Sequence, residues 1–232
     1  MYMDIQILHM IEGARQARGS AVIIDVFRAF TVEAYLMRNG AARVIPVGDK
    51  ALAYAYKQAH PDAVLVGERL GRILPGFDFG NSPSQLEHVD LTGKTVIHTT
   101  SAGTQGIANA VHATEILTGS LANAAAIARY LQKTGAEQVS LVCMGLNAEA
   151  QTEEDNLCAD YIKSLLEGCP MDISAQLQDL QRTSGAKFFD PAQQEVFPER
   201  DFWLSTEVDK FDFVLRLETG ADGLGQMVAI PV

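Results

Sequence analysis

Acidic and basic side chains follow two short apolar runs of this sequence, at positions where strands of a parallel sheet would end. Asp25 follows the run 21–24 and Arg28 comes three residues later, while Glu68 and Arg69 follow a second run further along the chain. The carboxyl ends of parallel strands lie at one edge of a sheet, where open α/β proteins bind their ligands. We therefore expect these side chains to face one cleft.

Two further runs are followed by hydroxyl groups and acids. The run 95–98 precedes the hydroxyl side chains of Thr99, Thr100, Ser101 and Thr104. A helix candidate begins nearby, so free backbone N–H groups and the helix dipole would favour an anion there. The run 139–143 precedes a second helix candidate, whose apolar stripe turns Glu154 toward the sheet with Asp155 beside it, while Glu153 points away.

The segment 67–83 is the least regular part of this region, because glycines and prolines interrupt it throughout. Long ordered loops in compact domains are usually functional. The second half of the segment contains Asp78, Asn81 and Ser82, which we expect to bind and enclose the substrate. The alternative is a loop that packs on its own phenylalanines.

These residue types suit a narrow class of chemistry. Carboxylates from separate strands are hard oxygen ligands for Mg²⁺, which takes one or two of them together with water and substrate oxygens. Arginines hold phosphate, carboxylate or sulfonate oxygens through paired donors. We predict metal-assisted chemistry on a small anionic phosphorylated substrate. The candidate metal ligands are Asp25, Glu68, Glu154 and Asp155, and the candidate catalytic residues are Asp25, Arg28, Glu68 and Arg69.

Each of these groups also has a structural interpretation. Asp25 and Arg28 could form a simple ion pair. The threonines and the serine after the run 95–98 could cap a helix, and the acids near Glu154 could belong to a capping box. The chemical interpretation rests on finding such groups at four separate strand ends.

The composition limits the classes of partner. The chain has 232 residues, 47% of them hydrophobic, which is enough for a sizeable core. Its net charge of −11 argues against a nucleic-acid partner. The three cysteines have no metal-binding spacing, and no signal-like segment or long apolar run occurs, so we expect a cytoplasmic protein without a membrane span. The oligomeric state stays open, although acidic α/β enzymes are commonly homo-oligomers.

Short apolar runs alternate with segments of helical period, which predicts an α/β fold with a mostly parallel sheet. The runs are 21–24, 43–47, 63–66, 95–98 and 139–143, and the helix candidates are 31–39, 50–60, 106–113, 121–133 and 153–167. The stretch 170–232 is predicted to be an irregular subregion that adds strands near 211–217 and 227–232, in antiparallel orientation. Because no linker separates this subregion, we expect residues 1–232 to form a single domain.

Several motifs occur in a characteristic order. They are VIIDVFRAFT at 22–31, GERLG at 67–71, GFDFGNSP at 76–83, Thr99 and Thr100 with Gly103 and Thr104, and Glu154 and Asp155 with Cys158 and Ala159. In order and spacing they resemble the Mg²⁺-dependent 2-phosphosulfolactate phosphatases of coenzyme M biosynthesis. The resemblance covers roughly residues 4 to 168 well. It implies a three-layer α/β sandwich around a central mixed sheet, and hydrolysis of 2-phospho-3-sulfolactate to 3-sulfolactate and phosphate.

The sequence departs from this family's usual pattern beside the expected anion site. Phe27, Phe30 and Val32 replace an aliphatic residue and hydroxyl residues, and Ser101 with Ala102 stands where the family usually has a single asparagine. The substrate therefore stays open: a phosphatase for another 2-hydroxy-acid phosphate is one alternative, and a non-catalytic anion-binding protein is another.

The mechanistic hypothesis divides the site by charge. The carboxylates would bind Mg²⁺ or activate water, and the two arginines would hold the phosphate with help from Ser101 and Thr104. Attack by water and transient phosphorylation of Asp25 both remain open.

Overall fold

The computed structural model describes residues 3–232, and within this range ten strands form one sheet. The strands are β1 (Asp4–His9), β2 (Ser20–Ile24), β3 (Arg43–Pro46), β4 (Val64–Arg69), β5 (Arg72–Ile73), β6 (Thr95–Thr99), β7 (Glu115–Gly119), β8 (Gln138–Cys143), β9 (Phe213–Thr219) and β10 (Gly225–Pro231). The α-helices are α1 (Met10–Gln16), α2 (Ala29–Arg38), α3 (Lys50–Ala59), α4 (Pro83–Leu86), α5 (Gly103–Asn109), α6 (Ala124–Thr134), α7 (Glu153–Leu166), α8 (Ser174–Leu180) and α9 (Glu199–Ser205). The order along the sheet is β1-β8-β2-β7-β9-β10-β3-β6-β4-β5.

Two groups of parallel strands make up most of this sheet. One group is β1-β8-β2-β7 and the other is β3-β6-β4. The antiparallel hairpin of β9 and β10 lies between them. The hairpin pairs with β7 at two positions and with β3 at one, where Met227 lies opposite Val44. The predicted α/β class and mostly parallel sheet are confirmed, and the C-terminal strands join the two parallel groups.

A buried carboxylate on α2 adds a second link between the two groups. Glu33 accepts a hydrogen bond from the Thr118 hydroxyl on β7 (2.8 Å), and its other oxygen lies 3.3 Å from Nδ1 of His98 on β6. All three side chains are fully buried. The two groups of strands are thus held by side chains where backbone pairing between them is sparse.

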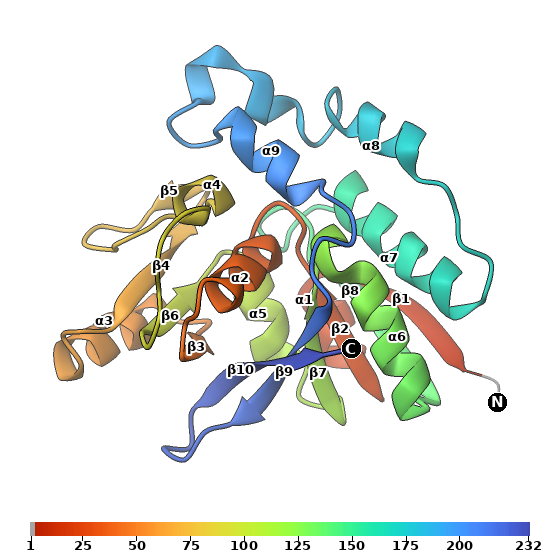
Figure 1. The fold of residues 1–232 in the computed structure, drawn as a ribbon, viewed down its shortest axis with the longest axis horizontal. Coiled ribbons are helices and arrows are strands. Elements are labelled where there is room, and N and C mark those ends of the chain that lie inside the picture. Colours follow the sequence, from red (N-terminus) through yellow and green to blue (C-terminus); the bar gives the residue numbers. More distant parts are fainter. Residues whose placement is uncertain (1–2) are drawn as a thin grey trace.

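The helices cover both faces of the sheet (Figure 1). Side chains alternate across a strand, so successive residues enter different cores. Ile23 and Val44 pack in the core shared with α1, α2 and α5. Val22 packs on the opposite face with α6 and α7, and Ile45 packs there with α3 over the other group of strands. The result is the three-layer sandwich implied by the family resemblance.

The five apolar runs of the sequence all form strands, namely β2, β3, β4, β6 and β8. The strands β1 and β7 and the two-residue strand β5 lie outside the predicted runs. In β7 only Ile116 and Leu117 are large and apolar, so no run stands out. β1 lies at an edge of the sheet, where Asp4 and Gln6 stay exposed between apolar neighbours.

The C-terminal stretch 170–232 contains more regular structure than its sequence indicates. It holds the short helices α8 and α9 and two 3₁₀ turns before the hairpin of β9 and β10. Figure 1 shows the part from α8 to α9 crossing one end of the sheet. Among the residues that the structure describes, no helix is both long enough and apolar enough to span a membrane.

β4 and β6 approach closely at Gly67, directly before Glu68. The φ angle of Gly67 is +153°, and a Cβ at this position would lie 2.0 Å from the Thr99 carbonyl oxygen. A side chain here would therefore separate the two strand ends or strain the backbone. The strand end that carries Glu68 depends on this glycine.

We predict that Gly67→Ala lowers the free energy of unfolding by about 2–5 kcal/mol, because overpacking adds to backbone strain. Gly76→Ala is the matched control, since Gly76 also has a positive φ of +75° but open space around it. Its cost should be about 1–2 kcal/mol. Urea unfolding of both variants measures the difference, and equal losses would contradict the role of strand contact at Gly67.

Candidate active site

A cavity of about 110 Å³ lies at the carboxyl ends of β2, β4, β6 and β8. Segments from the C-terminal stretch close it, through Lys187 and Phe197. The predicted site residues that line it are Asp25, Arg28, Glu68, Asn81, Ser101, Glu154 and Asp155. The structure therefore brings together acids from two strand ends, those of β2 and β4, and from the first turn of α7.

Asp25 lies at the floor of the cavity, one residue beyond β2. Its Oδ1 accepts a hydrogen bond from the N–H of Ala29 (3.1 Å), which begins α2. Gly103, which begins α5, lies so close that a Cβ there would be 3.0 Å from the other carboxylate oxygen. Burial raises the pKa of Asp25 to about 6, and the nearby charges of Glu68 and Glu154 act in the same direction.

Glu68 connects the turn that follows β4 to the loop that follows β6 through hydrogen bonds. Its Oε1 accepts a hydrogen bond from the N–H of Ser101 (2.6 Å). Its Oε2 accepts from the N–H of Gly71 (2.6 Å) and from the Ser101 hydroxyl (3.1 Å). The side chain is therefore both a cavity acid and the connection between two loops.

The start of α7 places two buried acids beside Asp25. Asp155 accepts hydrogen bonds from the N–H groups of Val26 and Gly145, both at 2.8 Å, and so connects the ends of β2 and β8. Glu154 is equally buried, and its Oε2 has no hydrogen-bond partner. Burial raises the pKa of both carboxyls, and in Asp155 the charges of Glu154 and Asp25 raise it further.

The cavity acids fit a divalent cation of the Mg²⁺ type. Within residues 3–232, no three His, Cys, Asp or Glu side chains converge closely enough to enclose a metal by themselves. Mg²⁺ does not need such a cage, because it keeps several waters and uses one or two carboxylates together with phosphate oxygens. The unpartnered oxygen of Glu154 and the raised pKa of Asp25 make these two acids the candidate ligands of such a cation.

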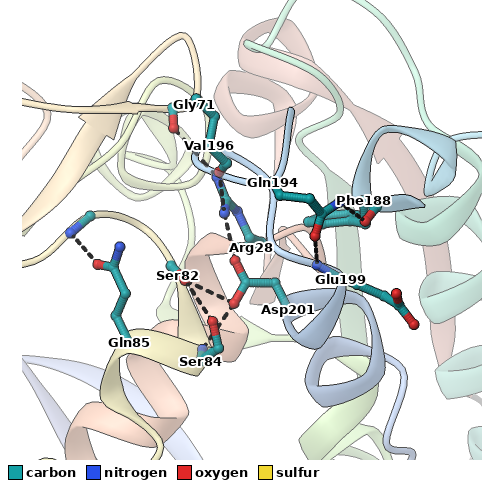
Figure 2. A network of polar contacts seen from close by, with 11 residues as sticks. Arg28, Gly71, Ser82, Ser84, Gln85, Phe188, Gln194, Val196, Glu199 and Asp201 are labelled. Atoms are coloured by element: carbon teal, nitrogen blue, oxygen red, sulfur yellow. Dashed lines mark hydrogen bonds and ion pairs between the residues drawn. The ribbon is translucent and has the colours of Figure 1, made fainter. Parts of the chain in front are cut away.

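Arg28 is held from several sides by main-chain and side-chain oxygens (Figure 2). Its Nη1 donates to the Asp201 carboxylate at 2.6 Å and to the Val196 carbonyl at 2.9 Å. Asp201 also accepts from the Ser82 hydroxyl (2.8 Å) and from the N–H of Ser84 (2.9 Å). Nη1 is thus committed to the protein, whereas Nη2 donates, within the described residues, only to the Gly71 carbonyl oxygen, at 3.5 Å, and Arg28 still lines the cavity.

Two further predicted residues lie outside the main cavity, near β4. Arg69 turns away from it and donates to the Gly48 carbonyl and to the Thr99 hydroxyl. Asp78 is half exposed, accepts a hydrogen bond from the N–H of Leu65 (2.7 Å) and faces Lys57 at 3.5 Å. In this structure both side chains support the loop 67–83.

The predicted hydroxyl groups divide in a similar way. Thr100 and Thr104 each accept a hydrogen bond from the other's backbone N–H, which fixes the start of α5. Since the N–H of Ser101 donates to Glu68, the main-chain donors expected to bind an anion are already occupied by protein oxygens. Ser82 lies in a neighbouring small cavity that shares Arg28 and Asn81 with the main one.

Lys187 lines the cavity but is not among the site residues predicted from the sequence. It lies in a 3₁₀ turn, residues Ala186–Phe189, within the stretch predicted to be irregular. The only signal in the sequence is a lysine directly before two phenylalanines, Phe188 and Phe189, and such a signal is weak. Lys187 does not follow a strand, so its position in the sequence does not mark it as a site residue.

Comparison with known proteins gives one consistent result. A family model described as 2-phosphosulpholactate phosphatase matches residues 6–219. The chain is 31% identical over 201 residues to the "Probable 2-phosphosulfolactate phosphatase" of Bacillus subtilis (strain 168), which covers 85% of this chain and 86% of that protein. A protein with the same description from Caldanaerobacter subterraneus is 31% identical over 215 residues, with 87% and 88% covered. A third, from Carboxydothermus hydrogenoformans, is 39% identical over 166 residues, with 71% and 68% covered.

The raised pKa of Asp25 predicts a pH-dependent cost to stability. The folded protein holds this proton up to about pH 6, whereas the unfolded chain releases it near pH 4, so stability falls as the pH rises between these values. In the absence of divalent cations, Asp25→Asn should therefore stabilise the protein by about 2–3 kcal/mol at pH 7.5 and much less at pH 4.5. Urea unfolding at both pH values measures this. The exposed Asp62→Asn serves as control, and the same gain at both pH values would refute the assignment.

The buried ion pair predicts a large effect of Asp201→Asn. Arg28 and Asp201 are 3% and 0% exposed, so this variant leaves a buried guanidinium without its countercharge. We expect a loss of about 3–5 kcal/mol in the free energy of unfolding. Asp212→Asn is the matched control, because it breaks an Arg–Asp pair with Arg129 that is 46% and 85% exposed. Its cost should stay below about 1 kcal/mol, and similar losses in both variants would contradict the prediction.

Proposed function

Since the chain belongs to the 2-phosphosulpholactate phosphatase family, we propose that it is a Mg²⁺-dependent phosphatase that converts 2-phospho-3-sulfolactate and water to 3-sulfolactate and phosphate. The observation that carries this proposal is the cavity at the strand ends. It combines buried acids suited to a cation with two cationic side chains suited to an oxyanion, Arg28 and Lys187.

Two of the cavity acids would hold the metal. Asp25 and Glu154 are the best candidates, because Glu154 has an unpartnered oxygen and Asp25 uses one oxygen on α2. When bound, Mg²⁺ supplies positive charge to the phosphoryl oxygens and orients them. Glu68 and Asp155 accept several main-chain hydrogen bonds, so they serve mainly to fix the loops around the cavity.

The side chains of the cavity define the remaining steps. Arg28 can direct the part of its guanidinium that Asp201 does not hold toward the phosphoryl group and stabilise its charge. A carboxyl with a pKa near 6, as in Asp25, can exchange a proton near neutral pH with the attacking water or the leaving oxygen. Attack by water and transient phosphorylation of Asp25 are both compatible with this placement.

The cytoplasm is the compartment in which we propose that the enzyme works. All three cysteines, Cys143, Cys158 and Cys169, are free thiols, and the first two are buried. Free thiols suit a reducing compartment. The substrate is a small anion and needs no membrane surface.

We predict that the purified protein releases phosphate from 2-phospho-3-sulfolactate only when Mg²⁺ is present, and that EDTA abolishes the release. Asp25→Asn should lower kcat by at least about 100-fold, since it removes both a metal ligand and a proton carrier. A colorimetric phosphate assay with phospholactate and phosphoglycerate as comparison substrates tests selectivity.

Three other results would change the conclusion. Faster hydrolysis of a carboxylate analogue would move the assignment to another 2-hydroxy-acid phosphate. Phosphate binding without turnover would indicate an anion-binding protein. Full activity in EDTA would exclude the metal.

A further inference from the structure

Lys187 occupies an unusual place in the cavity wall. Its Nζ lies 5.3 Å from the ring centroid of Phe197, 5.5 Å from that of Phe188 and 6.0 Å from that of Phe27. Within the described range 3–232, no carboxylate approaches this ammonium within 4.0 Å, although four acids line the same cavity. The charge therefore faces aromatic rings and open cavity.

The neighbouring cation, Arg28, differs from Lys187 because it has a carboxylate partner. One end of the Arg28 guanidinium meets the carboxylate of Asp201 at 2.6 Å. Arg28 also lies over the same wall, with its Cζ 4.9 Å from the Phe197 ring centroid. Lys187 shares this aromatic wall and lacks the carboxylate. Ring contacts attract a cation more weakly than a buried carboxylate does and do not replace an ion pair.

The charges around the Lys187 ammonium would allow a further anion to bind beside it. Burial lowers the pKa of Lys187, and the charge of Arg28 lowers it further. The opposing charges of Glu154, Asp25 and Asp155 do not fully offset these two effects on the pKa. Two of the acids sit at strand ends and two at the start of α7, whereas the two cations come from the turn that contains Lys187 and from the start of α2. A ligand that bridges the two walls would place its oxyanion against Lys187 and relieve the unfavourable burial.

We propose that Lys187 is a substrate-binding residue whose ammonium holds a tetrahedral oxyanion of the ligand, either the phosphoryl group or the sulfonate. The identity of the ligand rests on the proposed function, whereas the presence of an oxyanion site at Lys187 does not. The C-terminal stretch is then part of the active site and supplies one of its charges.

The test compares Lys187→Met with Lys210→Met. Methionine keeps an unbranched apolar stem against the rings and removes the charge. Lys210 is the matched control, because its Nζ also lies over an aromatic ring, Tyr35 at 5.4 Å, but it pairs with Glu207 outside the cavity. Isothermal titration with inorganic phosphate and, separately, with 3-sulfolactate gives Kd without turnover.

We expect Lys187→Met to raise at least one of these two Kd values by about tenfold or more, and Lys210→Met to change neither. A rise confined to phosphate assigns the phosphoryl group to Lys187, and a rise confined to 3-sulfolactate assigns the sulfonate. Lys187→Arg should retain wild-type binding within about threefold, since it keeps the charge. Unchanged Kd values in Lys187→Met would overturn the proposal.

A measurement on the wild-type protein covers the case in which Lys187→Met does not fold. Phosphate or 3-sulfolactate should slow acylation of Lys187 by acetic anhydride, read by mass spectrometry, and leave the rate at Lys210 unchanged. Equal rates with and without both ligands would also overturn the proposal. If wild-type protein binds these anions through Lys187 and hydrolyses no phosphate ester, the proposed function fails and the oxyanion site stands.

Discussion

The ion pair between Arg28 and Asp201 holds together the segments that form the candidate site. Arg28 lies at the start of α2, three residues after Asp25, and Asp201 lies on α9. The same carboxylate accepts hydrogen bonds from Ser82, which lies in the loop 67–83, and from Ser84 directly after it. A buried guanidinium needs a buried countercharge, because an unpaired ion in a protein interior costs several kcal/mol. The C-terminal stretch is therefore fixed over the strand ends by the residue pair that also orients a cavity cation.

This pairing decides how charge is distributed in the cavity. Asp201 neutralises Arg28, and the other cavity cation, Lys187, makes no ion pair, so among residues 3–232 none of the cavity acids has a salt-bridge partner. Burial raises the pKa values of Asp25, Glu154 and Asp155, and in Asp25 and Asp155 the charges of neighbouring acids raise them further. Sites arranged in this way trade stability of the empty fold for affinity toward protons, metal ions or cationic groups. The charges of the acids are stabilised fully only when a cationic ligand is bound.

The fold follows from the sequence wherever burial on both faces leaves an uninterrupted apolar run. The strands β2 and β8 lie inside the sheet, and apolar residues such as Val22, Ile23 and Leu141 predict them. The edge strand β1 and the short strand β7 lack such runs. The central place of the hairpin of β9 and β10 depends on contacts between residues over a hundred positions apart, such as Met227 with Val44. Local patterns carry no information about such pairing.

The site shows the same division between local and distant information. Asp25, Glu68 and Glu154 are predictable, because a polar residue directly after a buried strand, or on the inward face of a helix start, has its place set by that element. Lys187 belongs to a turn whose position is set by packing of Phe188 and by the distant pair of Arg28 and Asp201. A residue of a characteristic motif can therefore lie outside the cavity. Asp78 is an example, because it accepts a hydrogen bond from the backbone of β4. Residues that a distant segment contributes to a cavity can be identified only from the three-dimensional structure, which shows that segment packed on the strand ends.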